Sequence, residues 1–133
     1  MPRLAVQKDF TPSHCRKILQ AGIRKQDFSF VAHSIAKIPE KEFAKVAGTS
    51  ERTISRLKSD QAIPERAAEV VLSILRAFRK ACEVFGDEEK AVLWLNRPNT
   101  VLGGSSPLPL LHTRFGAEEV MDVLTRIEYG VYS

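Results

Sequence analysis

The segment from Pro64 to Phe85 constrains the fold more than any other part of the chain, because it is long, continuous and amphipathic. Proline is favoured in the first turn of a helix, and Gly86 can end the helix with a left-handed residue. Between them, apolar residues recur at three-to-four spacing and form one broad stripe. They are Ala67, Val70, Val71, Ile74, Leu75, Phe78, Ala81, Cys82 and Phe85. Such a segment predicts the central helix of a helical core.

The remaining segments also have helical rather than strand periodicity. Ser13 can cap a helix that Gly22 ends, Asp27 can begin the next, and Asp87 can cap another beyond Gly86. Further helices are therefore expected at residues 13–21, 27–36, 40–47, 51–59, 87–96 and 117–130. Because no alternating pattern of useful length is present, the predicted fold class is all-α.

Composition excludes several classes of protein. A chain of 133 residues with 44% apolar and 27% charged side chains is typical of a soluble globular protein of one domain or two small ones. The longest strongly apolar stretch, residues 67–78, contains Glu69 and Arg76, so no membrane span is expected. Cys15 and Cys82 have neither a zinc-site spacing nor a disulfide framework, and we expect buried thiols in a cytoplasmic protein.

Charge divides the chain into two parts. Residues 1–80 contain 16 basic and 8 acidic side chains, whereas residues 81–133 contain 4 basic and 8 acidic ones. A basic part commonly binds phosphate and an acidic part does not, so the division predicts two domains with different partners. Solvated faces that differ in charge without functional meaning are the alternative.

Residues 40–59 fit a helix-turn-helix. Ala44 is small where the two helices would cross, Gly48 supplies the positive φ of the turn, and Ser50 can cap the second helix. Ile54 and Leu57 would hold the second helix against the first. Thr49 departs from this pattern, because such motifs usually bury an aliphatic side chain at that position.

The outward face of the second helix is suited to the major groove of DNA. Arginine can bind guanine through two hydrogen bonds, and serine can bind phosphate or base edges. The candidate DNA-binding residues are Lys45, Ser50, Arg52, Ser55, Arg56 and Lys58. Lys41 and Arg66 lie nearby in sequence and would neutralise phosphates. A helical hairpin that serves only as scaffold is the alternative.

The last 50 residues contain a more specific combination of motifs. It comprises Phe85-Gly86-Asp87, Ala91, Trp94-Leu95, Pro98, residues 102–104, Pro107-Leu108, Leu111, Thr113, Gly116, Val120, Leu124 and residues 127–130. In order and spacing these residues resemble the toxin-binding domain of the Xre/MbcA/ParS antitoxins, which pair with RES-domain toxins. That family has an Xre-like helix-turn-helix upstream, where this chain has residues 40–57.

The resemblance implies an antitoxin that neutralises an NAD-consuming RES-domain toxin and represses its own operon by binding operator DNA. It also implies a helix-turn-helix domain at residues 1–80, a small helical toxin-binding domain at 81–133, and a homodimer within a larger complex. The chain end would reach the NAD-binding cleft of the toxin. The inhibitory residues would then be Glu128, Tyr129, Gly130, Val131, Tyr132 and Ser133.

No catalytic or cofactor-binding constellation is apparent. His14, His33 and His112 lie in three separate segments without a carboxylate at a telling offset, and no phosphate-binding glycine loop or metal spacing is present. We therefore expect neither enzymatic activity nor a bound metal or cofactor. A stand-alone transcription regulator whose C-terminal helices only dimerise, and an antitoxin that has lost DNA binding, remain alternatives.

Overall fold

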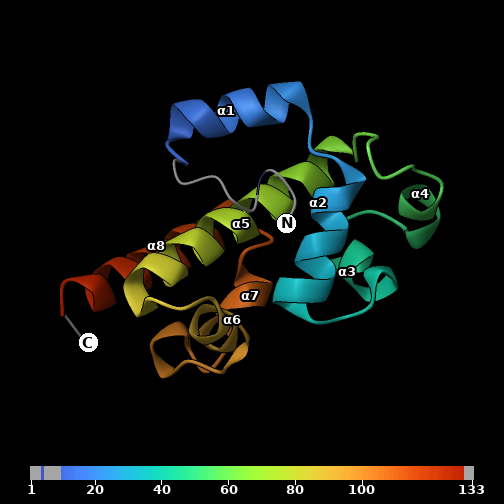
Figure 1. Ribbon diagram of the computed structural model, residues 1–133. Coiled ribbons are helices and arrows are strands. Elements are labelled where there is room, and N and C mark those ends of the chain that lie inside the picture. The colour runs from blue at the N-terminus through green and yellow to red at the C-terminus, as the bar shows by residue number, and fades with distance from the viewer. Residues whose placement is uncertain (1–3, 5–9, 131–133) are drawn as a thin grey trace. The chain divides into compact units, whose positions relative to one another are not determined.

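The computed structural model describes residue 4 and residues 10–130, and within these residues the chain is helical (Figure 1). Eight α-helices, a π-helical segment and a short 3-10 helix form the regular structure there, without a strand. The predicted all-α fold class is confirmed. The chain divides into two compact units, Met1–Leu75 and Arg76–Ser133, and the division falls inside α5 (Glu65–Phe85).

The first unit opens with α1 (Pro12–Ala21), whose start differs from the prediction. The side chain of Thr11 accepts a hydrogen bond from a backbone N–H of the first turn, so the N-cap is Thr11 and the prediction of Ser13 was wrong. Proline at the first helical position sets this start, because its missing N–H would have no partner there. Gly22 ends α1, as predicted, with φ of 90°.

The next helical segment starts earlier than predicted. α2 (Lys25–Phe30) begins after Arg24, so Asp27 is not its cap and lies buried in the first turn. The chain continues as a π-helix, η2 (Val31–Ala36), which ends at Lys37 with φ of 60°. A left-handed conformation at a residue other than glycine carries a conformational cost, and here it stops the helix before Pro39.

Two phenylalanines are the largest fully buried side chains of the first unit. The rings of Phe28 and Phe43 lie with centroids 4.9 Å apart and planes tilted by 50°. Fully buried aliphatic residues of the unit include Ile23, Val31, Ile35, Ala44, Ala67, Val71 and Ile74. Burial of each large apolar side chain contributes about 1.5 to 3 kcal/mol, so this core is the main source of stability in the unit.

The second unit contains the end of α5 followed by short helices. These are α6 (Glu88–Asn96), η3 (Thr100–Leu102), α7 (Pro107–Leu110) and α8 (Arg114–Glu128). Asp87 caps α6 as predicted, and its carboxylate accepts the Glu89 N–H at 2.9 Å. Packing of α7 against α6 and α8, and of η3 against α8, joins these helices into one unit.

The last helix is longer than predicted at its N-terminal end. α8 begins after Thr113, whose hydroxyl accepts the Gly116 N–H at 3.1 Å, rather than at Ala117. Gly130 follows the helix end with φ of 72°, as expected for a helix stop. The fully buried residues of the unit include Ala81, Ala91, Leu95, Leu111, Val120 and Leu124.

Trp94 and the two cysteines are only partly buried. Trp94 is half-buried, with its ring tilted by 41° against Phe85 at a centroid distance of 5.9 Å. Cys15 and Cys82 form no disulfide and are partly exposed, so the prediction of buried thiols was wrong. None of the helices in the described ranges has the length and apolar character that a membrane crossing requires.

Candidate functional site

α3 (Glu40–Val46) and α4 (Glu51–Ser55) form the helix-turn-helix that the sequence predicts. Ala44 is fully buried between them, and Gly48 occupies the turn with φ of 75°. A Cβ at Gly48 would lie 2.5 Å from Nε of Arg66, so a side chain there would meet both backbone strain and a steric conflict. Arg66 thus packs against the turn.

The second helix of the motif is shorter than predicted. α4 ends at Ser55, and of the two residues expected to hold it in place only Ile54 is buried. Leu57 is partly buried and lies in the turn that follows α4. Ser50 is the N-cap, as predicted, and its hydroxyl accepts the Thr53 N–H at 3.1 Å.

All six candidate DNA-binding residues are exposed; they are Lys45, Ser50, Arg52, Ser55, Arg56 and Lys58. Both serines already form internal hydrogen bonds, because Ser50 caps α4 and the Ser55 hydroxyl donates to the Arg52 carbonyl at 3.2 Å. Arg52 and Arg56 are separated by one helical turn and therefore project from the same side of the motif. The arginines, rather than the serines, are the groups best placed to contact DNA.

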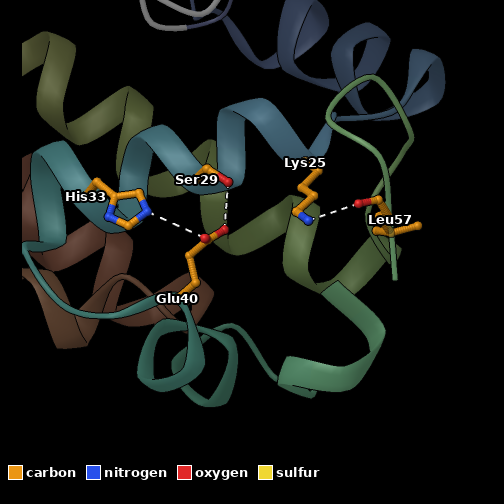
Figure 2. A network of polar contacts seen from close by, with 5 residues as sticks. All are labelled: Lys25, Ser29, His33, Glu40 and Leu57. Carbon is orange, nitrogen blue, oxygen red and sulfur yellow. Dashed lines mark hydrogen bonds and ion pairs between the residues drawn. The ribbon is translucent and has the colours of Figure 1, made fainter. Parts of the chain in front are cut away.

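A contact between distant segments holds the end of the motif in place, and no sequence pattern indicated it. Backbone N–H groups of Ile63, Lys25 and Gln26 donate to the carbonyls of Ile23, Gln61 and Ser59 at 2.8, 2.9 and 3.0 Å. The Lys25 ammonium donates to the Leu57 carbonyl at 2.9 Å (Figure 2), and the Arg24 guanidinium to the Asp60 carbonyl at 2.6 Å. Two basic residues are thereby used to position the segment after α4.

Glu40 joins the first helix of the motif to α2 and η2. Its carboxylate accepts a hydrogen bond from the Ser29 hydroxyl at 2.6 Å and lies 3.5 Å from Nε2 of His33 (Figure 2). Because Glu40 is the first residue of α3, its negative charge also interacts favourably with the positive end of the helix dipole. The fold thus brings to His33 a carboxylate that sequence spacing did not reveal, and both side chains have a structural role.

The candidate inhibitory residues at the chain end are described only in part. Tyr129 ends α8 with 75% of its surface exposed, and Gly130 is exposed beside it. Glu128 forms an ion pair with Lys80, with Oε1 and Nζ 2.7 Å apart. The other three candidates, Val131, Tyr132 and Ser133, lie outside the described residues.

Sequence reasoning missed further exposed apolar residues in the second unit. Phe115 is 76% exposed on the first turn of α8, Leu93 is 56% exposed on α6, and Val101 is exposed on η3. In the described part of the first unit, Val46 is the one large exposed hydrophobic residue. The start of α8 at Arg114 places Phe115 inside the helix, whereas the prediction began that helix three residues later, at Ala117.

In the described residues, no group of three or more His, Cys, Asp and Glu side chains is arranged to hold a metal ion. The first unit has a helix-turn-helix with a basic surface. The second unit has exposed apolar residues on helices whose other exposed residues are mainly acidic. Surfaces of these kinds suit binding to other macromolecules.

These features define a small helical protein in which a helix-turn-helix precedes a separate C-terminal helical unit. Residues 80–130 match the family described as the antitoxin Xre/MbcA/ParS C-terminal toxin-binding domain. The chain is 35% identical over 103 residues to an antitoxin Xre of Yersinia enterocolitica, covering 76% of this chain and 70% of that relative. It therefore belongs to the Xre antitoxin family.

A second relative supports the same assignment. An antitoxin Xre of Photorhabdus laumondii is 32% identical over 94 residues, which covers 69% of this chain and 64% of the relative. The chain thus spans just under two thirds of this second relative. The match at residues 80–130 includes α6, η3, α7 and α8, and therefore nearly the whole second unit.

Proposed function

We propose that this protein is an antitoxin that binds and neutralises a cognate RES-domain, NAD-consuming toxin and represses its own operon through the helix-turn-helix. The match of residues 80–130 to a toxin-binding domain carries the first part of the proposal. The exposed aromatic residues of that unit support it, because Phe115 and Tyr129 are the kind of side chain that anchors a protein interface. The RES identity of the toxin rests on the resemblance of the C-terminal motifs.

The proposed inhibitory element is the chain end, residues Glu128, Tyr129, Gly130, Val131, Tyr132 and Ser133. Because Tyr129 is exposed after the last buried turn of α8, removal of residues 129–133 should leave the core of the second unit intact. The truncated protein should retain its helical circular dichroism and promoter binding. It should fail to prevent NAD loss and growth arrest when the toxin is co-expressed.

The control for this truncation is the full-length chain co-expressed with the same RES-domain toxin, which should protect cells. Full protection by the truncated chain would assign inhibition to another surface, with the acidic residues Glu118, Glu119 and Asp122 of α8 as the next candidates. Unfolding of the truncated chain would mean that the tyrosines support the fold. Failure of the full-length chain to bind any RES-domain protein would overturn the proposal as a whole.

For DNA binding, we propose that Arg56 and Arg52 contact base edges and that Lys45 and Lys58 contact phosphates. Both arginines are exposed, Arg52 on α4 and Arg56 directly after its last residue, in a part of the chain with 16 basic and 8 acidic residues. An Arg56→Ala variant should bind the native promoter more weakly by about 1 to 3 kcal/mol if the arginine contacts a guanine. The affinity should fall steeply with salt, because lysines displace counterions from phosphates.

The matched control is Arg114→Ala, which removes an equally exposed arginine from the second unit. It should leave promoter affinity unchanged. If Arg52→Ala combined with Arg56→Ala binds the promoter as tightly as the native chain, with native circular dichroism, the motif does not read DNA. We further propose a cytoplasmic protein that dimerises, since two helix-turn-helix motifs would match a two-fold operator.

A further inference from the structure

The outer face of α8 carries an exposed aromatic residue at each end. Phe115 is 76% exposed near the start of the helix and Tyr129 is 75% exposed at its end. At 100° and 1.5 Å per residue, fourteen residues turn the helix to within about 40° of the same face and advance it by about 21 Å. The two rings therefore lie on one side of the helix, away from its buried residues Val120 and Leu124.

Both ends of this helix are held rigidly by the rest of the second unit. At the start, Gly116 packs so closely on α7 that an added Cβ would lie 2.0 Å from the Leu110 carbonyl oxygen. At the end, the Lys80 ammonium holds the Glu128 carboxylate at 2.7 Å. Because both rings lie on a helix that is packed at both ends, little conformational entropy of this surface would be lost when a partner buries them.

The residues between the two rings indicate what covers them. Between positions 115 and 129 the outer face has three exposed acidic residues, Glu118, Glu119 and Asp122, and one exposed basic residue, Arg126, so it carries a net negative charge. Arg114 pairs with Glu118 at 3.8 Å, but both side chains are largely exposed and the pair is correspondingly weak. A second copy related by a two-fold axis would bring two faces of net negative charge together, which is less favourable than a basic partner, and DNA would be repelled as well.

We propose that this face of α8 is the docking surface for the toxin, and that it binds a basic strip flanked by two apolar pockets about 20 Å apart. The proposal rests on the proposed antitoxin function and extends it, because docking by the helix is separate from inhibition by the chain end. In this arrangement Phe115 contributes to affinity alone, whereas Tyr129 belongs both to the docking face and to the inhibitory end.

The test compares single substitutions in the full-length chain, using a catalytically inactivated RES-domain toxin as the binding partner. Phe115→Ala should weaken binding by about tenfold to a hundredfold in a titration, with unchanged circular dichroism and promoter binding. The matched control is Leu93→Ala, which removes an exposed side chain of the same unit that lies on α6. It should change the affinity less than threefold, as a peripheral contact would.

Charge is tested by replacing Glu119 and Asp122 together with lysine. Both residues are exposed, so the fold should tolerate the change. At low salt the variant should associate with the toxin at least tenfold more slowly than the native chain. At high salt the difference between the two association rates should become smaller, because salt screens the charges. A toxin that binds the lysine variant as fast as the native chain at low salt would contradict the basic strip in the proposal.

The outcomes separate this inference from the proposed function. If the native chain binds no RES-domain protein, the proposed function fails. Suppose instead that the native chain binds the toxin, and that Phe115→Ala and the double variant Phe115→Ala, Tyr129→Ala both bind it as tightly as the native chain does. Then the antitoxin function stands and only the proposed docking face is wrong. If sedimentation shows that Phe115→Ala dissociates a dimer while toxin affinity is unchanged, the face is a contact between copies and the inference is overturned.

Discussion

The two units use their aromatic residues in opposite ways. In the first unit Phe28 and Phe43 are fully buried against each other, and the exposed surface of the helix-turn-helix is basic. In the second unit Phe115 and Tyr129 are about three quarters exposed on a helix with an acidic outer face. The buried rings stabilise the core of the first unit, whereas the exposed rings of the second unit are the ones assigned to partner binding in the proposal above.

The two units also position their surfaces differently. In the first unit, side chains reach across to backbone carbonyls, as Lys25 does to Leu57 and Arg24 to Asp60. In the second unit, hydroxyl or carboxylate caps and one very close backbone approach at Gly116 set the helix starts. The difference teaches that some basic residues in the first unit position the backbone, whereas Glu118, Glu119 and Asp122 of α8 remain at the surface.

The largest expected effect is on stability, and it appears when a phenylalanine is replaced by alanine in each of the two units. Phe43→Ala removes a fully buried ring and should lower the free energy of unfolding by about 3 to 5 kcal/mol through the cavity it leaves. Phe115→Ala removes a mostly exposed ring and should change it by about 0.5 kcal/mol or less. Urea denaturation followed by circular dichroism measures both. Equal losses would show that Phe115 is part of the folded core.

A smaller effect is expected at glycine. Gly116→Ala should cost about 2 to 3 kcal/mol, because the added Cβ meets the Leu110 carbonyl oxygen and the backbone must move. Gly103→Ala, with φ of 70° and open space around the added Cβ, should cost about 1 kcal/mol from backbone strain alone. Thermal unfolding of the two variants measures the difference, and the reverse order would contradict the close approach of α7 and α8.

Replacement of Lys25 by methionine tests the positioning role of basic residues in the first unit. Loss of the bond to the Leu57 carbonyl should lower stability by about 1 kcal/mol. Amide hydrogen exchange should accelerate at residues 57–63, and promoter affinity should fall although Lys25 does not contact DNA. Lys41→Met, a change at an exposed lysine on α3, is the control for loss of charge alone. If the two variants exchange equally, Lys25 acts only through its charge.

The smallest effect concerns Cys82. Burial raises the pKa of this thiol; Arg79 opposes the increase, and the acidic residues Glu88, Asp87 and Glu83 add to it. Because the thiolate is the reactive form, a raised pKa means less thiolate at neutral pH and slower alkylation. In a Cys15→Ser chain, iodoacetamide should therefore modify Cys82 more slowly than it modifies free cysteine. An equal or faster rate would contradict the direction of the shift.

Local signals in the sequence were sufficient to predict much of this fold. Helix stops at Gly22, Gly86 and Gly130, the caps Ser50 and Asp87, and the long stripe of α5 all follow from short-range physics and were predicted correctly. The errors also have local causes: Pro12 moved the first cap to Thr11, and the Thr113 cap lengthened α8. A prediction from spacing alone cannot choose between neighbouring caps of similar strength.

What the sequence could not indicate depends on contacts between distant residues. From the sequence, Arg24 and Lys25 cannot be distinguished from other basic residues that could bind phosphate. In the structure their side chains donate hydrogen bonds to the carbonyls of Asp60 and Leu57. A phenylalanine is usually buried in a core, but Phe115 lies on the exposed side of the first turn of α8. The functional roles assigned to Arg56 and to the chain end remain predictions, since neither is tested by the fold.

The half-buried ring of Trp94 gives this protein a built-in optical label. It is the single tryptophan, and the first 93 residues contain no tyrosine either, so near-ultraviolet absorbance at 280 nm and tryptophan fluorescence both arise from the C-terminal part of the chain. With Phe85 beside it and part of its surface in solvent, the indole is placed to change emission when its surroundings alter. Emission therefore follows the unit that contains α6 and α8, whereas far-ultraviolet ellipticity follows every helix of the chain.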